Sequence, residues 1–312
     1  MIRILDGPQI AKALDYSELM ERIAAVFRSA STAPLRHHHA FGADAGTLLL
    51  MPAWNGQFAG VKIATVVPGN TARGIANVQA TYFLLDGKTG QPLAVLEGRE
   101  LTLRRTAATS ALASRYLSRP DSTRFLLVGA GALGTHLARA HARVRPIREI
   151  AIWNRTPAHA EALAGALATE FAGQGIAVRA TADLAGAVAV ADIVSTATLA
   201  TEPILRGDWL KPGQHLDLVG GFRPHMREAD DATLRRASLY CDARAAATKE
   251  SGDLIGPLER GVIAPADILG DLFDLVRREG PARARPDEIT LFKSVGHAIE
   301  DLAAAILAYE RA

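Results

Sequence analysis

The segment Gly129-Ala130-Gly131-Ala132-Leu133-Gly134 constrains the fold of this chain more than any other segment. It follows the apolar residues 125–128, which predict a buried strand, and it opens a stretch with helical spacing. In such a unit the first glycine permits a tight turn, the second lets the backbone approach a pyrophosphate, and the third lets the helix pack on the strand. The first helical turn then offers N–H groups to phosphate oxygens. We therefore predict that all six residues bind a dinucleotide, the alternative being a purely structural turn.

The residues after the next predicted strand indicate which dinucleotide is bound. An enzyme that uses NAD usually places Asp or Glu about 20 residues after the glycines, where the carboxylate binds the ribose hydroxyls. This chain has Asn154, Arg155 and Thr156 there. A carboxylate would repel a 2′-phosphate, whereas a guanidinium binds it and a threonine hydroxyl donates to it. The sequence favours NADP(H) over NAD(H); the alternative is that Arg155 is a solvated surface residue.

Apolar runs alternate with helical periods through the second part of the chain. Helices are predicted from residue 133 and over 157–171, and strands at 124–128, 149–153, 177–180, 193–197 and 214–219. This alternation is typical of α/β proteins with a Rossmann fold, a doubly wound parallel sheet with helices on both faces. Ligands of such sheets lie outside the carboxyl ends of the strands.

The first part of the chain has a different pattern. Helices are predicted over 16–28 and 101–117, and between them lie strands at 47–51, 60–67, 78–85 and 92–96. A last helix, from about 294 to 309, is expected to return to this part. We place a boundary at Pro120-Asp121. The expected domains are a smaller α+β domain for substrate binding and dimerisation, residues 1–120 plus 297–312, and a dinucleotide-binding domain, residues 121–296.

Composition excludes several classes of protein. The formal charge is +2, and the sequence has no run of five basic residues, which argues against nucleic-acid binding. The sequence has no stretch of about 18 uninterrupted apolar residues, which a membrane span would need. One cysteine, Cys241, and an N-terminus without a signal-peptide pattern make the cytoplasm the expected location. His37, His38 and His39 alternate faces in an extended chain, so no metal site is expected.

Taken with the dinucleotide motif, further segments resemble the ornithine cyclodeaminase and mu-crystallin family. They are Leu50-Met51-Pro52-Ala53, Lys62, Arg104-Arg105-Thr106-Ala107-Ala108, Gly220-Gly221-Phe222-Arg223-Pro224-His225-Met226-Arg227-Glu228, Lys249-Glu250-Ser251-Gly252-Asp253 and Leu291-Phe292-Lys293-Ser294-Val295-Gly296. The resemblance covers nearly the whole chain. It implies a homodimer whose substrate domain is formed by the N-terminal part and the last helix.

The resemblance also implies chemistry at the carbon between an amine and a carboxylate, and it assigns residues to the cofactor. Members of the family include cyclodeaminases, alanine dehydrogenases, and reductases of cyclic imino acids and ketimines. They line the cofactor after the strand that ends near Ser195. The residues expected at this edge of the sheet are Thr196, Thr198, Val219 and Gly220.

Two cations are predicted to act on the substrate. Arg105 lies on the apolar stripe of its helix, where a charge is costly unless it is paired; the family's matching arginine binds the substrate carboxylate. Lys62 lies in a strand between Gly60 and Ala64, whose small side chains leave room for a ligand. Burial beside arginines should lower the pKa of Lys62 and suit it to proton transfer at the imine nitrogen. The alternatives are that Arg105 forms an internal salt bridge and that Lys62 is an exposed lysine on its strand.

Three further residues are expected near the substrate because their positions match the family. Arg36 corresponds to another substrate-contacting arginine of the family. Met51 lies in one of the matching segments, and Lys293 precedes the last helix in a segment that the family places near the nicotinamide.

Phe222 is the main departure from the cyclodeaminase pattern. Cyclodeaminases have an aspartate at this position that handles protons on the substrate nitrogen, and a phenyl ring cannot do so. The sequence therefore favours NADPH-dependent reduction of a cyclic imino acid or ketimine, such as pyrroline-2-carboxylate, to an L-amino acid. The alternatives are an ornithine cyclodeaminase with bound NAD and a non-catalytic small-molecule binding protein of the mu-crystallin type.

Overall fold

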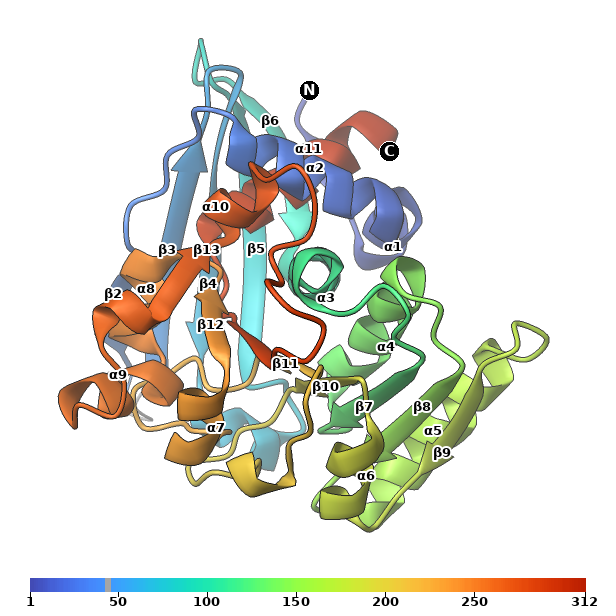
Figure 1. The fold of residues 1–312 in the computed structure, drawn as a ribbon. Helices are drawn as coiled ribbons and strands as arrows, with labels where there is room; N and C mark the ends of the chain where they lie inside the picture. The colour runs from blue at the N-terminus through green and yellow to red at the C-terminus, as the bar shows by residue number, and fades with distance from the viewer. Residues whose placement is uncertain (43–45) are drawn as a thin grey trace. The chain divides into compact units, whose positions relative to one another are not determined.

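A computed structural model describes residues 1–42 and 46–312 of the chain (Figure 1). The described residues form two compact units, Met1–Ala108 with His297–Ala312, and Thr109–Gly296. The first boundary lies inside helix α3 (Gly98–Leu117), whereas the sequence analysis expected it at Pro120, after the helix has ended. Twenty residues of uninterrupted helix give no local sign of where one unit ends and the other begins.

The first unit contains a six-stranded sheet in the order β1-β6-β5-β4-β3-β2. Among the strands that the structure describes in this unit, only the pair β1 and β6 is parallel. The strands and helices are β1 (Arg3–Leu5), α1 (Gly7–Ala13), α2 (Tyr16–Arg28), β2 (His37–Phe41), β3 (Gly46–Trp54), β4 (Phe58–Val66), η1 (Pro68–Arg73), β5 (Val78–Asp86), β6 (Pro92–Glu97), the start of α3, and α11 (Ala298–Arg311).

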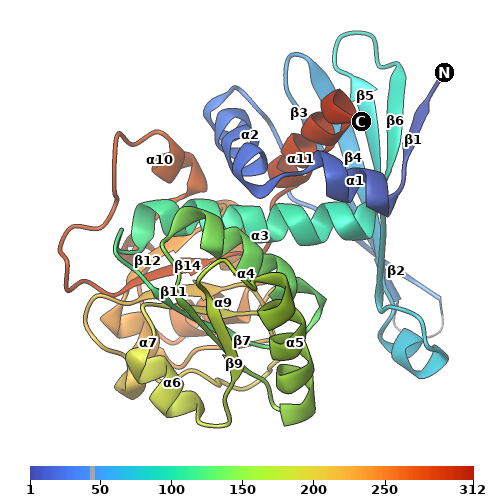
Figure 2. The ribbon, with the colours of Figure 1, turned by 90° about the vertical axis from the view of Figure 1, so that its right-hand side faces the viewer.

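One face of this sheet is covered by helices. Helix α11 lies against β3, β4 and β5, and α2 lies beside α11, as both views of the ribbon show (Figures 1 and 2). Every residue of α11 from Ala298 to Ala308 is buried, because its alanines let the sheet and α2 approach closely. A helix that is buried all round can carry charged residues in its first turn only if they are paired.

The second unit is built on an eight-stranded parallel sheet in the order β13-β12-β14-β11-β10-β7-β8-β9. Its elements are β7 (Arg124–Val128), α4 (Ala132–Val144), β8 (Glu149–Trp153), α5 (Pro157–Glu170), β9 (Ala177–Ala180), α6 (Leu184–Val190), β10 (Ile193–Thr196), η2 (Gly207–Trp209), β11 (His215–Leu218), α7 (Asp231–Arg236), β12 (Ser238–Cys241), α8 (Arg244–Glu250), α9 (Gly252–Glu259), η3 (Pro265–Asp267), β13 (Ile268–Asp271), α10 (Leu272–Val276) and β14 (Thr290–Lys293). The predicted fold class, a doubly wound Rossmann sheet plus a second α+β unit, is confirmed.

The order of these strands fixes where a ligand binds. From β7 the chain runs outward through β8 and β9, and it then returns to place β10 on the other side of β7. The carboxyl ends of β7 and β10 therefore flank the switch point at which doubly wound sheets bind ligands.

The last helix begins later than its apolar period suggests. It was expected from about residue 294, and it begins at Ala298. The backbone N–H groups of Val295 and Gly296 instead donate to Oδ2 of Asp242, and Gly296 has a φ of 82°. The chain is thus held out of helical geometry until His297, which caps the helix.

Candidate functional site

The glycine-rich turn lies at the carboxyl end of β7, at the switch point of the second unit. Gly129 has a φ of 111°, and a Cβ there would lie 2.6 Å from the carbonyl oxygen of Ala197. A Cβ on Gly131 would meet no atom within 4 Å, so this side of the turn is open to a ligand. A Cβ on Gly134 would lie 2.9 Å from Leu127, which requires glycine for close packing of α4 on β7. The three glycines therefore have the environments that a dinucleotide turn needs.

Asn154 ties this turn to the end of β8. Its Oδ1 accepts a hydrogen bond of 3.1 Å from the N–H of Ala130, and its Nδ2 donates to the carbonyl oxygen of Thr156 at 3.0 Å. Both functions of the amide are used inside the protein, so Asn154 shapes the turn. Arg155 and Thr156 are exposed beside it, and the Thr156 hydroxyl makes no capping bond to α5.

The predicted cofactor residues at the ends of β10 and β11 are tied to one another. The hydroxyls of Thr196 and Thr198 each donate to the buried carboxylate of Glu228 at 2.7 Å. Gly220 donates its N–H to the same carboxylate, also at 2.7 Å, and Val219 donates to the carbonyl oxygen of Thr196. These residues form one continuous edge. Glu228 ends one of the segments that resemble the family, but its role in joining Thr196, Thr198 and Gly220 was not predicted.

The predicted substrate residues Lys62 and Arg105 meet at one carboxylate in the first unit. Asp301, in the first turn of α11, lies 2.8 Å from Nζ of Lys62 and 2.8 Å from Nε of Arg105. Nη1 of Arg105 lies 2.6 Å from Oε2 of Glu300. All four side chains are buried.

The charges in this cluster change the titration of its members. Burial and the charge of Arg105 lower the pKa of Lys62 to about 8, although Asp301 opposes them. The positive charge of the half-buried Arg36 also lowers the pKa of Lys62, so Arg36 interacts electrostatically with this cluster. Burial raises the pKa of Asp301, but Arg105 and Lys62 outweigh it and the net shift is downward. The charges of Arg105 and Arg36 thus make the ammonium of Lys62 easier to deprotonate, while Asp301 holds it in place.

Met51 and Lys293 have different surroundings. Met51 is buried and pairs in register with Lys62 across β3 and β4, so it belongs to the same part of the sheet. Lys293, at the end of β14 in the second unit, is fully buried, and its Nζ lies 3.0 Å from Oδ2 of Asp253. Its ammonium therefore has a partner inside the protein, and its expected contact with substrate remains a prediction.

The sequence profile of the ornithine cyclodeaminase/mu-crystallin family matches residues 4–312. The chain belongs to this family. The resemblance inferred from the sequence motifs is thereby confirmed.

Relatives within the family are similar over most of their length. A Delta(1)-pyrroline-2-carboxylate reductase of Paracoccus denitrificans is 41% identical over 265 residues, which cover 84% of this chain and 82% of the relative. The structure of the Thermococcus litoralis Delta(1)-pyrroline-2-carboxylate reductase with NADH and L-proline has a TM-score of 0.94 at 33% identity and covers 99% of this chain and 97% of that chain. An archaeal alanine dehydrogenase dimer with bound NAD has a TM-score of 0.91 at 26% identity and covers 99% and 95%.

Three residues of the cluster around Lys62 and Arg105 in the first unit were not predicted from the sequence. Glu300 and Asp301 are adjacent carboxylates on an alanine-rich helix, a signal of buried charge that the search for apolar periodicity passed over. Tyr82 pairs in register with Lys62, and within the described residues its buried hydroxyl has no hydrogen-bond partner. Burial and Asp301 raise the pKa of this tyrosine well above its ordinary value. No local sequence pattern marks such a residue.

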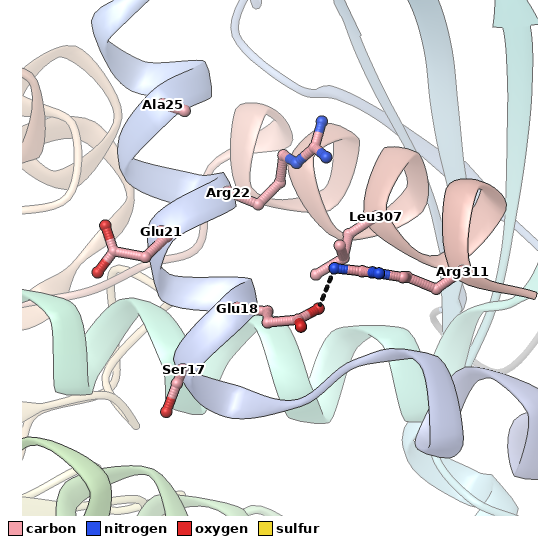
Figure 3. Close-up of a pocket in the computed structure, with 7 residues that line it drawn as sticks. All are labelled: Ser17, Glu18, Glu21, Arg22, Ala25, Leu307 and Arg311. Atoms are coloured by element: carbon pink, nitrogen blue, oxygen red, sulfur yellow. Dashed lines mark ion pairs between the residues drawn. The ribbon is translucent and has the colours of Figure 1, made fainter.

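A surface hollow of about 480 Å³ lies elsewhere on the same unit, between α2 and the end of α11 (Figure 3). Its charged side chains pair with their neighbours: Glu18 lies 3.1 Å from Arg311, and Arg22 pairs with Glu310. We do not assign a ligand to this hollow. Within residues 1–42 and 46–312, no group of three metal-ligating side chains is present, and no helix is long and apolar enough to cross a membrane.

Proposed function

We propose that the protein reduces a cyclic imino acid or ketimine of the pyrroline-2-carboxylate type to an L-amino acid, with NADPH as the hydride donor. The observation that carries the proposal is the pair of buried cations, Lys62 and Arg105, held by the one carboxylate of Asp301. A substrate with a carboxylate beside a C=N bond needs a cationic clamp for the first group and a proton donor for the second.

The broader class of activity was predicted from the sequence as an NAD(P)-dependent oxidoreductase acting on the C=N or CH–NH bond of amino or imino acids. That class is confirmed by the relatives, which include a Delta(1)-pyrroline-2-carboxylate reductase and a neighbour with NADH and L-proline. The named substrate type, the preference for NADPH and a cytoplasmic location are our proposals.

Arg105 would hold the substrate carboxylate. Among residues 1–42 and 46–312, its contacts with Glu300 and Asp301 use Nη1 and Nε, which leaves Nη2 for a ligand. The two carboxylates fix the plane of the guanidinium, so a substrate carboxylate would meet a preoriented donor. Arg36 adds a second positive charge near Lys62.

Lys62 would supply the proton. When bound, the nicotinamide supplies a hydride to the imine carbon. Because the pKa of Lys62 is lowered to about 8, its ammonium is protonated at neutral pH but gives up a proton far more readily than an exposed lysine. The proton passes to the imine nitrogen, which becomes the amine of the product. Asp301 keeps Nζ in place during this transfer.

The experiment that tests the proposal follows NADPH absorbance with pyrroline-2-carboxylate. We expect oxidation of NADPH and formation of L-proline in equal amounts. Release of ammonia from ornithine without NADPH oxidation would instead establish a cyclodeaminase. Phe222, which has no titratable group, argues against that outcome. Ligand binding that is unchanged in variants of Lys62 and Arg105, with no turnover, would favour a binding protein.

The NADPH preference is supported by Arg155, exposed at the end of β8 without a carboxylate in the adjoining residues 154–156. Arg155→Ala should raise the KM for NADPH by about tenfold or more, the loss of a charged hydrogen bond to phosphate, and leave the KM for NADH unchanged. Arg148→Ala, at the exposed amino end of β8, is the matched control. If Arg155→Ala raised the KM values for NADPH and NADH by the same factor, Arg155 would not bind the 2′-phosphate.

A homodimer through the uncovered face of the first-unit sheet is also proposed. Apolar side chains alternate onto this face, where Ile4 is 75% exposed, Trp54 43% and Phe83 37%; the contiguous residues Val61, Ile63 and Val95 are half-buried. Phe83→Glu should give a monomer in light scattering, whereas Val190→Glu, at an exposed apolar position on α6, should leave the dimer intact. A dimer of the Phe83 variant would place the interface elsewhere.

A further inference from the structure

Glu228 is a fully buried carboxylate that joins the ends of two neighbouring strands. Its Oε1 accepts from the N–H and the hydroxyl of Thr198, at 2.8 and 2.7 Å. Its Oε2 accepts from the hydroxyl of Thr196 and the N–H of Gly220, both at 2.7 Å, and more weakly from Gly221. Residues after β10 and residues after β11 are thus bound to the two oxygens of one side chain.

The chemistry of these donors requires a carboxylate at this position. A backbone N–H can only donate, and each oxygen of Glu228 faces at least one backbone N–H. Burial and the charge of Asp253 raise the pKa of Glu228, and the charge of Lys293 and the threonine hydroxyls offset only part of that rise. The isosteric amide of glutamine would turn an NH₂ group toward one of these N–H groups, which would then lose its acceptor.

A second layer holds Glu228 itself. Oδ1 of Asp253 accepts from the N–H groups of Glu228 and Ala229, at 2.7 and 3.1 Å. Oδ2 of Asp253 lies 3.0 Å from Nζ of Lys293, at the end of β14. A Cβ on Gly221 would lie 2.3 Å from the same oxygen, so the backbone of the β11 end packs directly on this pair.

The position of these strand ends identifies the part of the cofactor that they face. In doubly wound sheets the glycine turn binds the pyrophosphate and the end of the next strand binds the adenosine ribose, which here would be the turn of Gly129–Gly134 and the end of β8. Strands β10 and β11 continue the sheet on the opposite side of β7 from β8. The half of the dinucleotide beyond the pyrophosphate would therefore extend over the edge that Glu228 holds together.

We propose that Glu228 is a positioning residue that fixes the ends of β10 and β11 for the nicotinamide half of the cofactor. This inference rests on the proposed function, because it requires a nicotinamide dinucleotide. Glu228 acts through the hydroxyls of Thr196 and Thr198 and the backbone N–H groups of Thr198, Gly220 and Gly221.

The test compares two ligands that share the adenosine half. NADPH carries nicotinamide, whereas 2′-phospho-ADP-ribose lacks it. Glu228→Gln should weaken NADPH, measured by the fluorescence of its reduced ring, by about tenfold or more, the loss expected for hydrogen bonds to a charged acceptor. The affinity for 2′-phospho-ADP-ribose, measured by calorimetry, should change by less than about twofold, because the β7 and β8 ends are untouched. A merely structural role would weaken both ligands alike.

Asp192→Asn is the matched control. Asp192 accepts from the N–H groups of Thr123 and Arg124, at the amino ends of the strands, and pairs with Arg119. Like Glu228, Asp192 is a carboxylate that accepts from backbone N–H groups, but it lies at the opposite ends of the strands. Asp192→Asn should therefore change the affinities for NADPH and 2′-phospho-ADP-ribose by the same factor.

Glu228→Asp keeps the inference testable if the glutamine variant does not fold. The shorter carboxylate keeps its charge but cannot reach both strand ends, so NADPH should again be weakened selectively. Equal losses for the two ligands, or unchanged NADPH affinity in either variant, would overturn the inference while leaving the proposed function intact. If the unmodified protein bound neither NADPH nor NADH, the proposed function and this inference would both be wrong.

Discussion

Two buried lysines, one in each unit, form the same kind of ion pair in opposite surroundings. Nζ of Lys62 lies 2.8 Å from Asp301, and Nζ of Lys293 lies 3.0 Å from Asp253. The charges of Arg105 and Arg36 lower the pKa of Lys62, beside the carboxylates of Asp301 and Glu300. The charge of Lys293 acts on the further buried carboxylates of Glu228 and Asp217. The neighbouring cations suit Lys62 to releasing a proton, whereas the neighbouring carboxylates suit Lys293 to serving as their counter-ion.

The largest expected difference between the two lysines is in catalysis. Lys62→Met should lower kcat/KM for imino-acid reduction by about 10²- to 10⁴-fold, the usual contribution of a general acid. The fold should survive, because Asp301 keeps its contact with Arg105. Lys88→Met, in an exposed turn of the same unit, is the control. If Lys62→Met left kcat/KM unchanged, Lys62 would not be the proton donor, and the two lysines would not differ in catalysis.

The pH dependence of the same reaction sharpens this prediction. The acid form of Lys62 is lost as pH rises through about 8, so kcat/KM should fall above that pH. Lys62→Arg keeps its charge at all accessible pH values, so any residual activity should lack this alkaline limb. If kcat/KM of Lys62→Arg still fell above about pH 8, the fall would come from the titration of another group.

The second expected difference is in stability. Lys293→Met leaves Asp253 and Glu228 buried without a cation, and breaking a buried pair in this way costs about 3–5 kcal/mol. Urea unfolding of this variant should show that loss, whereas Lys62→Met should lose less, since Arg105 remains beside Asp301. Lys249→Met, at an exposed position, should be neutral. Equal losses for the two buried lysines would mean that their surroundings do not matter.

The sequence predicted both lysines but not the difference between them. The glycine motif and the strand-helix alternation are local signals, and they located the Rossmann sheet. The cations Lys62 and Arg105 came from their positions in local patterns and family motifs, and they located the cluster in the first unit. The partners Asp301, Glu228 and Asp253 lie 239, 32 and 40 residues from the groups that they bind. Contacts at such separations are set by the packing of whole elements, so local periodicity cannot reveal them. The four-residue strands β12, β13 and β14 were not predicted, although β9, β10 and β11 are as short and were predicted from their place in the strand-helix alternation.

Asp217 extends the comparison to a buried carboxylate that, among the described residues, has no lysine within ion-pair distance, although the charge of Lys293 still acts on it. It accepts a hydrogen bond of 2.5 Å from Ser195, and its Oδ2 lies 3.9 Å from Nε2 of His141. Burial raises the pKa of Asp217 to about 7, while burial lowers the pKa of His141 to about 4 and that of His215 well below its ordinary value. Because burial outweighs the charge of Lys293, the carboxyl is expected to keep its proton below about pH 7, and burial keeps the two histidines neutral.

These shifts have opposite effects on stability as pH changes. The contribution of Asp217 is fully present below its unfolded pKa of about 3.8 and is lost as pH rises toward 7. The contribution of each histidine is present above about 6.5 and is lost as pH falls. Asp217 therefore offsets part of the histidine effect between about pH 4 and 6.5. Asp217→Asn removes this offset, so the free energy of unfolding should rise more steeply with pH in the variant, by about 1.4 kcal/mol per pH unit. Urea unfolding at several pH values measures the two slopes, and parallel slopes would show that Asp217 is ionised like the carboxylates that face lysine.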